Sequence, residues 1–331
     1  MPAQLMLGDD PVDVQSLGLF YKSMPARLLD NNLNINALRT NTLLHKAEWE
    51  WLDSRVVEIS AQTLNAIGDL RALGLTRNLG GLGVLTAQYE QVSDMSDAEI
   101  NMAVEVDDEE DRVDFPLMSV PVPIISKSFR IDARSLAASR RFNSGLDATH
   151  VDTATRKVAE KLEEMFFIGS SINQGGTTIP GVLTESHVNA VAGGAVWTTA
   201  TNIYPNVLAM IAALQADNYY GPYRLYLNPA QFISMYALNA NTAVPIVDMI
   251  QRLPGFGPGS VKVSNFVTNH TGVLVNMTSD VVDLAIGQDI APVEWDEKGG
   301  LVSRFKILCA MVPRIKADAA GRSGIAVLAG I

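Results

Sequence analysis

Two strand-like segments on either side of an acidic run constrain the fold more than any other feature of this sequence. Residues 84–92 and 115–131 carry the β-branched, aromatic and alternating polar residues that are typical of strands. From Glu90 through Asp111 there are ten acidic residues and no basic one. The pattern predicts a long, protruding β-hairpin with an acidic tip. A two-stranded hairpin is marginally stable at best in water, so we expect it to need a surface on which to lie.

The first 40 residues predict an extended arm. They are rich in asparagine, and prolines at positions 2, 11 and 25 interrupt any long helix. Such a segment cannot bury itself alone, and it is either a disordered tail or a strap that becomes ordered on a neighbouring molecule. The strap is favoured by large apolar residues that solvated tails usually lack: Leu17, Leu19, Phe20, Tyr21, Met24, Leu28 and Leu29. The first ten residues contain no lysine or arginine, so we expect no secretory signal peptide.

Helical periodicity marks two long segments. Residues 42–70 place apolar residues three to four apart, which predicts one helix with a buried face. Residues 148–168 do the same, and Gly169 is well suited to follow a helix C-terminus. Residues 199–287 then alternate short helices and strands, and residues 288–331 are dominated by strands. The order of these elements predicts an α+β fold.

Composition limits the functions that this chain can have. Charged residues make up 18% of it, below the roughly 25% of a typical soluble domain, which suggests that surface is buried against further copies. The net charge of −11 makes the chain repel nucleic acid, which argues against a DNA-reading or DNA-condensing role. No apolar segment approaches the length of about 20 residues needed to cross a membrane, so we expect no membrane partner.

The sequence contains no recognisable catalytic, cofactor-binding or metal-binding pattern. The glycine-rich segments 78–83 and 255–259 lack the flanking residues of phosphate-binding loops. The four histidines are too far apart to form a helical metal pair. The single cysteine, Cys309, lies in an apolar run and is predicted to be a core residue. Glu160 and Glu163 lie among lysines on the second long helix, where we expect ordinary side-chain pairs.

Residues 107–111 form the densest acidic cluster. They lack the alternate spacing and the central glycine of a calcium-binding loop. Two interpretations remain open, a solvated loop and an electrostatic contact between subunits.

The order of these parts resembles a known family. An arm, a helix, a long hairpin, a second long helix, an α+β unit and terminal strands follow one another in the major capsid proteins of tailed bacteriophages. Their Hong Kong 97-like fold is shared by the encapsulins. Five stretches carry the resemblance: VPVPIISKSF at 120–129, KLEEMFFIG at 161–169, IPGVL at 179–183, YRLYLNP at 223–229 and DLAIGQD at 283–289.

By this resemblance the chain divides into six parts. They are an N-terminal arm (1–40), a helix associated with the peripheral domain (41–77), an extended β-hairpin loop that lies across an adjacent subunit (78–128), the peripheral domain with its long spine helix (129–198), the axial domain (199–287) and terminal strands of the peripheral domain (288–331). Some relatives weld subunits through a lysine in the extended loop. Because no lysine lies between Ala72 and Ser126, we expect a noncovalent shell.

The resemblance implies a major capsid protein of the virion, assembled in the cytoplasm of a bacterial host, that encloses double-stranded phage DNA without sequence-specific binding. It implies homo-oligomeric pentamers and hexamers, allows scaffolding, portal and decoration proteins as partners, and implies no enzyme activity and no cofactor. An encapsulin-type shell that holds a cargo enzyme is the alternative, and a cytosolic α+β enzyme is a third interpretation. The candidate intersubunit contacts are Leu19, Phe20, Tyr21, Glu105, Asp107, Asp108, Glu109, Glu110, Arg156, Lys157, Lys161 and Phe256.

Overall fold

The computed structural model describes residues 6–7, 10–11, 46–91, 93, 95, 100, 112–132, 134, 148–193, 197, 200–239, 243–297, 301–318 and 320–331. Its helices are α4 (Lys46–Thr63), α5 (Ala66–Ala72), α7 (Ala148–Phe167), α8 (Ala200–Ala216), α9 (Pro229–Ser234) and α10 (Ile246–Gln251). Its strands are β1 (Met6–Leu7), β2 (Asp10–Pro11), β3 (Thr76–Asn78), β4 (Thr86–Glu90), β5 (Leu117–Pro121), β6 (Ile124–Asp132), β7 (Gly169–Gln174), β8 (Thr177–Pro180), β9 (Asn189–Ala192), β10 (Tyr223–Leu227), β11 (Val261–Val263), β12 (Thr271–Asn276), β13 (Val282–Glu297), β14 (Val302–Ile315) and β15 (Ile325–Ala329). This mixture confirms the predicted α+β class.

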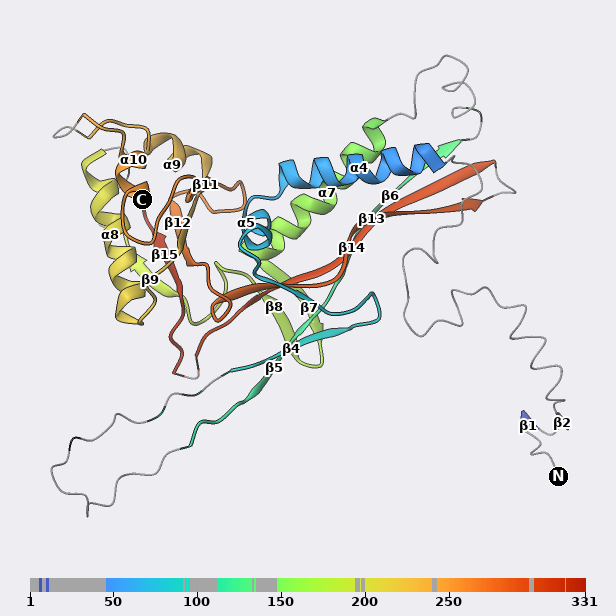
Figure 1. Cartoon of the computed structure of the whole chain (residues 1–331), viewed down its shortest axis with the longest axis horizontal. Coiled ribbons are helices and arrows are strands. Elements are labelled where there is room, and N and C mark those ends of the chain that lie inside the picture. Colours follow the sequence, from blue (N-terminus) through green and yellow to red (C-terminus); the bar gives the residue numbers. More distant parts are fainter. Residues whose placement is uncertain are drawn as a thin grey trace.

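The longest strands build a four-stranded sheet in the order β3-β13-β14-β6. β13 and β14 pair antiparallel from Val282 opposite Ile315 to Glu297 opposite Val302. Residues 291–295 continue β13, because its ladder with β14 resumes after a bulge between Ile286 and Ala291. Figure 1 shows α4 and α7 over one face of this sheet.

The helix predicted at 148–168 is confirmed as α7. Its predicted apolar stripe is buried: Val151, Ala154, Val158, Leu162 and Met165. The helix stops at Gly169, whose φ of +83° suits glycine. The backbone of residues 179–181 lies directly against the Gly169 α-carbon and leaves no room for a side chain there.

The single helix predicted at 42–70 is wrong, because the structure divides it into α4 and α5. The Glu163 carboxylate on α7 accepts hydrogen bonds from the backbone N–H groups of Ala66 (2.7 Å) and Ile67 (3.4 Å). These groups begin α5 and would otherwise have needed carbonyl partners from a continuous helix. The acceptor that α7 supplies therefore stabilises the break between α4 and α5. The local periodicity of residues 42–70 gives no indication of this break.

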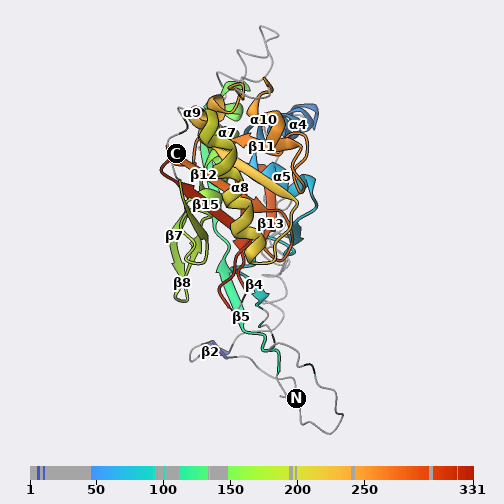
Figure 2. The ribbon, with the colours of Figure 1, turned by 90° about the vertical axis from the view of Figure 1, so that its left-hand side faces the viewer.

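A second sheet has five strands in the order β11-β10-β12-β15-β9. Side chains from α8 and α10 pack with it into a separate core that includes Ile203, Val207, Ile250, Leu225 and Leu274. Figure 2 shows α8 crossing in front of this sheet. The family resemblance implies that residues 288–331 are all terminal strands of the peripheral domain. The sheets divide that segment, because β14 joins the long sheet while β15 pairs antiparallel with β12.

β4 and β5 confirm the flanks of the predicted hairpin. They pair antiparallel from Thr86 opposite Pro121 to Glu90 opposite Leu117. The Gln91 N–H continues the ladder by donating to the Pro116 carbonyl at 3.0 Å. In Figure 1 the two strands project away from the body. The predicted acidic tip, residues 105–111, lies outside the described part of the chain.

Candidate assembly surfaces

A buried ion pair holds the base of the hairpin. The Arg314 side chain is fully buried, and its Nε donates to Asp283 Oδ1 at 2.6 Å while Nη2 donates to Oδ2 of the same carboxylate. Its Nη1 donates to the Gln88 carbonyl on β4 at 2.8 Å. Lys316 Nζ also donates to Asp283, at 2.8 Å. Because one guanidinium joins β13, β14 and β4, it sets the direction in which the hairpin leaves the body.

Two further side chains at the hairpin base reinforce this joint. The ring of Tyr89 lies below the Arg314 guanidinium, 5.6 Å from its central carbon, at a distance suited to a cation–π contact. Gln91 Nε2 donates to the carbonyls of Ala317 (2.9 Å) and Asp318 (2.7 Å). The hairpin is therefore tied to the turn after β14 as well as to the sheet.

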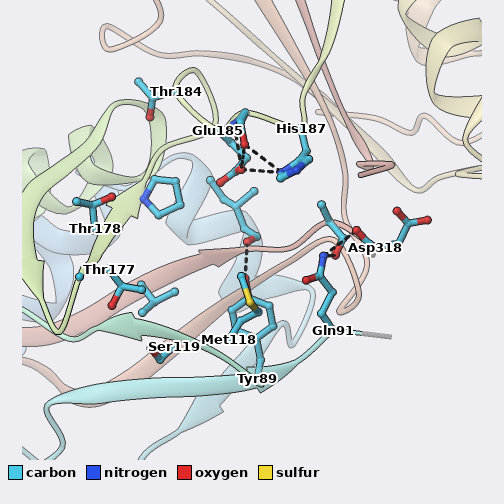
Figure 3. Close-up of a pocket in the computed structure, with 16 residues that line it drawn as sticks. Tyr89, Gln91, Met118, Ser119, Thr177, Thr178, Thr184, Glu185, His187 and Asp318 are labelled. Carbon is cyan, nitrogen blue, oxygen red and sulfur yellow. Dashed lines mark hydrogen bonds and ion pairs between the residues drawn. The ribbon is translucent and has the colours of Figure 1, made fainter. Parts of the chain in front are cut away.

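A cavity of about 540 Å³ lies between the hairpin base, β8, the loop at 184–187 and the turn after β14. Figure 3 shows Tyr89, Glu185 and His187 around it. Ser186 Oγ and Glu185 Oε1 both approach the same ring nitrogen of His187, Nδ1, at 3.1 and 3.2 Å. A hydrolytic triad needs the nucleophile and the acid on opposite ring nitrogens. This trio therefore lacks the arrangement of a serine hydrolase.

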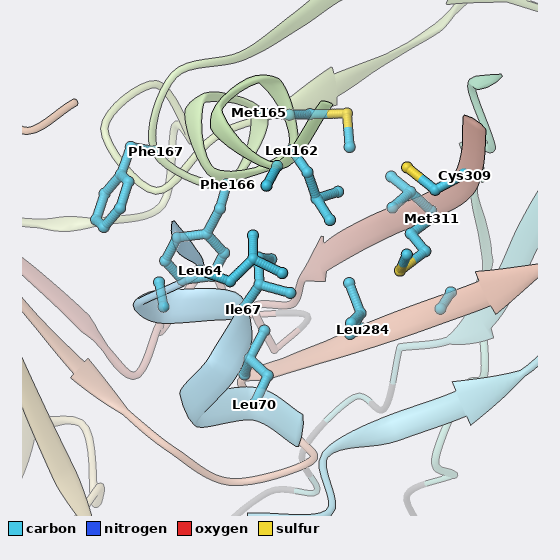
Figure 4. Close-up of a cluster of buried hydrophobic side chains, with 14 of the residues drawn as sticks. Leu64, Ile67, Leu70, Leu162, Met165, Phe166, Phe167, Leu284, Cys309 and Met311 are labelled. Carbon is cyan, nitrogen blue, oxygen red and sulfur yellow. The ribbon is translucent and has the colours of Figure 1, made fainter. Parts of the chain in front are cut away.

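A second polar cluster joins the helices α5 and α7 to the five-stranded sheet. Tyr226 on β10 donates its hydroxyl to Asp69 Oδ2 at 2.9 Å, and Lys262 on β11 donates to Asp69 Oδ1 at 2.6 Å. Asp69 lies on α5, and the first backbone N–H groups of α5 donate hydrogen bonds to Glu163. The cluster therefore connects α7, α5 and the five-stranded sheet. Figure 4 shows the apolar core beside it, where Phe166 and Leu162 from α7 meet Ile67 of α5.

The expectation for Glu163 is wrong and that for Glu160 is confirmed. Glu160 accepts an ordinary pair from Lys157 at 2.6 Å. Glu163 is buried, and this burial raises the pKa of its carboxyl to about 7, although the two backbone N–H donors favour the charged form. The sequence offered one indication that Glu163 is buried. Glu163 follows Leu162 and so lies at the edge of the apolar stripe of α7.

We expect Glu163→Gln to flatten the pH dependence of stability. The folded chain keeps a proton on Glu163 that the unfolded chain releases between about pH 4.5 and 7. The stabilisation is therefore complete below that range and is lost as the pH rises through about 7. Over this range the wild type should lose up to about 3 kcal/mol from this group. Urea unfolding at pH 5, 6.5 and 8 measures the slope, with Glu164→Gln as control, because Glu164 is partly exposed and pairs with Lys161. An unchanged slope in Glu163→Gln would contradict this role.

The structure describes four of the twelve predicted contact residues. Leu19, Phe20, Tyr21, Glu105, Asp107, Asp108, Glu109 and Glu110 lie outside the described residues. Arg156, Lys157 and Lys161 lie on the outer face of α7, where their charges pair with glutamates of the same helix. Phe256 is half-buried against Tyr223, with ring centroids 5.5 Å apart. Their role between subunits stays a prediction.

Cys309 is a core residue, as predicted. It is fully buried in the sheet, and burial raises the pKa of its thiol to about 12. A thiol in this state is not a nucleophile at neutral pH. The described residues contain no group of three or more potential metal ligands. Nor does any described helix have the length and hydropathy needed to cross a bilayer.

Large apolar side chains are exposed in two regions of the described chain. On and beside the hairpin they are Leu85, Phe115, Leu117 and Met118, and around α9 they are Ile233, Tyr236 and Leu238. Exposed apolar side chains that gather into a patch mark protein–protein contact sites. The exposed apolar side chains of the hairpin are consistent with the sequence prediction that it lies on another surface.

A long sheet covered by a spine helix, a second α+β unit and a projecting hairpin define a class of protein. This is the Hong Kong 97-like fold of shell-forming proteins. The virus-like particle from Pyrococcus furiosus matches with a TM-score of 0.61 and 17% identity, over 85% of this chain and 98% of that one. The capsid of Myoviridae phage XM1 matches with a TM-score of 0.61 and 12% identity, over 78% and 89%.

The family is narrower than the fold. Residues 36–308 match the family described as encapsulating protein for peroxidase, and the chain belongs to this family. The type 1 encapsulin shell protein EncA of Myxococcus xanthus is 24% identical over 273 residues, which are 82% of this chain and 90% of that protein. The chain is therefore a structural, shell-forming protein, and the interpretation as a cytosolic enzyme is set aside.

Proposed function

We propose that this chain forms an encapsulin-type compartment, a closed shell of many copies that holds a protein cargo. The observation that carries the proposal is the family match over residues 36–308, because the family is described by its encapsulation of a peroxidase. A peroxidase is accordingly the first cargo to look for. A phage capsid protein, which the sequence resemblance favours, becomes the second candidate function. It is supported by a likeness of fold to phage capsids.

Charge supports a protein cargo over a packed genome. The chain carries a net charge of −11, and each subunit would add to the electrostatic cost of holding a polyanion. A protein cargo needs no such neutralisation. It can be held by a short segment that binds the inner wall.

The two sheets suggest how copies meet in the proposed shell. The four-stranded sheet with α4 and α7 would form the peripheral domain, and the five-stranded sheet with α8, α9 and α10 the axial domain. The exposed Ile233, Tyr236 and Leu238 would then lie where copies converge around the axes of pentamers and hexamers.

The contents of the particles test this function. Particles purified from the cells that make this chain, after nuclease and protease treatment, are expected to contain a second, protected protein and no long DNA. Mass spectrometry identifies that protein, and the ratio of absorbance at 260 and 280 nm measures nucleic acid. Protected DNA of one uniform length would overturn the proposal and favour the phage capsid.

A further inference from the structure

Five basic residues gather at the far end of the four-stranded sheet. Lys127 and Arg130 lie on its edge strand β6 and Arg134 just beyond it, while Arg304 and Lys306 lie on the adjacent β14. Arg130 is directly opposite Arg304 in the ladder. We call these five residues the basic edge. A shallow cavity of about 260 Å³, lined by Ser128, Phe129, Arg130 and Arg304, lies within it.

Part of the basic edge faces away from the helices. Phe129 and Phe305 stack at 5.2 Å, and Phe129 also stacks on His150 of α7, so these two rings occupy the helix-covered face. Side chains alternate along a strand. Arg130, Arg304 and Lys306 therefore lie on the opposite face, together with the half-buried Trp295 that the ladder places beside Arg304.

Most of the basic edge has no counter-charge within the described residues. Arg304 pairs with Glu297 at 2.8 Å. Asp132 is the one carboxylate on β6 and β14, and it lies at the exposed outer end of β6. Lys127, Arg130, Arg134 and Lys306 thus have no ion-pair partner in the described part of the chain. Unpaired cations in a chain of net charge −11 point to an acidic partner.

The described strands of the hairpin, β4 and β5, and the basic edge lie at opposite ends of one copy. The chain runs from β5 through β6 in one direction, from the hairpin to the far end of the sheet (Figure 1). Leu117 and Arg130 are separated by 13 positions, which correspond to about 40 Å of extended chain. Because β4 and β5 point away from the basic edge, a hairpin from another copy is the one placed to meet it.

We propose that the acidic run Glu105–Asp111 of one copy binds the basic edge of a neighbouring copy. The proposal rests on the shell function and adds the surface that receives the hairpin. Two different, complementary patches at opposite ends make a head-to-tail contact, the kind that closes into rings. Each contact between exposed charges is weak, but a closed shell repeats it at every subunit.

A charge exchange tests the contact. Arg130→Glu with Lys306→Glu is expected to raise the protein concentration for half-maximal shell formation at least about tenfold, because like charges then face each other. Adding Asp107→Lys, Asp108→Lys, Glu109→Lys and Glu110→Lys to the same chain should restore assembly. The matched control, Arg77→Glu with Arg252→Glu, carries the same change of charge elsewhere. If the wild type forms shells and the Arg130→Glu/Lys306→Glu variant assembles at the same concentration, the proposed contact is wrong and the proposed function stands. If the wild type forms no shells, both the contact and the proposed function are wrong.

Zero-length cross-linking identifies the occupant directly. A carbodiimide applied to shells of mixed ¹⁴N and ¹⁵N copies should join Lys306 of one copy to a carboxylate within 105–111 of another. The edge cations could instead serve only to prevent strand pairing, in which case Lys306 would form no such link. Links to Asp13 or Asp30 would show that the N-terminal arm covers this face. Either result overturns the proposal.

Discussion

Asp283→Ala is expected to lower the free energy of unfolding by about 3–5 kcal/mol, the usual cost of breaking a buried ion pair from one side. It leaves the fully buried Arg314 guanidinium with the Gln88 carbonyl and the Tyr89 ring as its contacts. A guanidinium cannot escape this penalty by losing its proton. Denaturant unfolding of the dissociated subunit measures the loss. We also expect fewer shells, because the hairpin base is held by the same side chain.

The partner variant supplies the control. Arg314→Met should cost less than Asp283→Ala, because Asp283 keeps Lys316 at 2.8 Å and the methionine fills much of the vacated space. Asp283→Leu combined with Arg314→Met should recover much of the lost stability, since an apolar pair of similar volume needs no desolvation of charge. If Arg314→Met were the more damaging single change, the pair would not work as described.

Replacing residues 92–113 by a short glycine–serine turn is expected to abolish closed shells while the subunit still folds. The two apolar cores use side chains outside this segment, so the melting temperature of the subunit should change by only a few degrees. The loss of shells should be complete, because every copy loses a contact at once. Electron microscopy and light scattering measure the assembled fraction.

A variant of unchanged length separates reach from charge. Changing Asp107, Asp108, Glu109, Glu110 and Asp111 to their amides keeps the length of the loop and removes its densest charge. It should weaken assembly without abolishing it, since the apolar hairpin residues Phe115 and Leu117 remain exposed for contact. Normal shells from the shortened chain would show that the hairpin tip has no part in assembly.

The elements that could be predicted from sequence are those whose pattern is local. The α7 stripe repeats every three to four residues, so both its existence and its buried face follow from the sequence. The hairpin flanks alternate, and Cys309 lies in an unbroken apolar run. Each of these signals is contained within about 20 residues and needs no knowledge of distant neighbours.

The elements that could not be predicted depend on contacts between distant residues. The break between α4 and α5 is stabilised by Glu163, which is 97 residues from Ala66. The hairpin joint relies on Arg314, 226 residues from Gln88. Arg314 lies in the mostly apolar run 305–315, which indicates a buried charge. The sequence does not indicate that Asp283 is its partner. The place of β15 beside β12 likewise follows from sheet pairing alone.

The most direct test is the particle mass of this chain expressed alone, measured by mass photometry and by cryo-electron microscopy. If hairpins and exposed apolar residues of different copies contact one another, the chain should form closed, hollow particles. Their masses should take one or a few discrete values, each a large multiple of the 35.7 kDa subunit. A stable, compact monomer at high protein concentration, with the hairpin folded onto its own body, would contradict it.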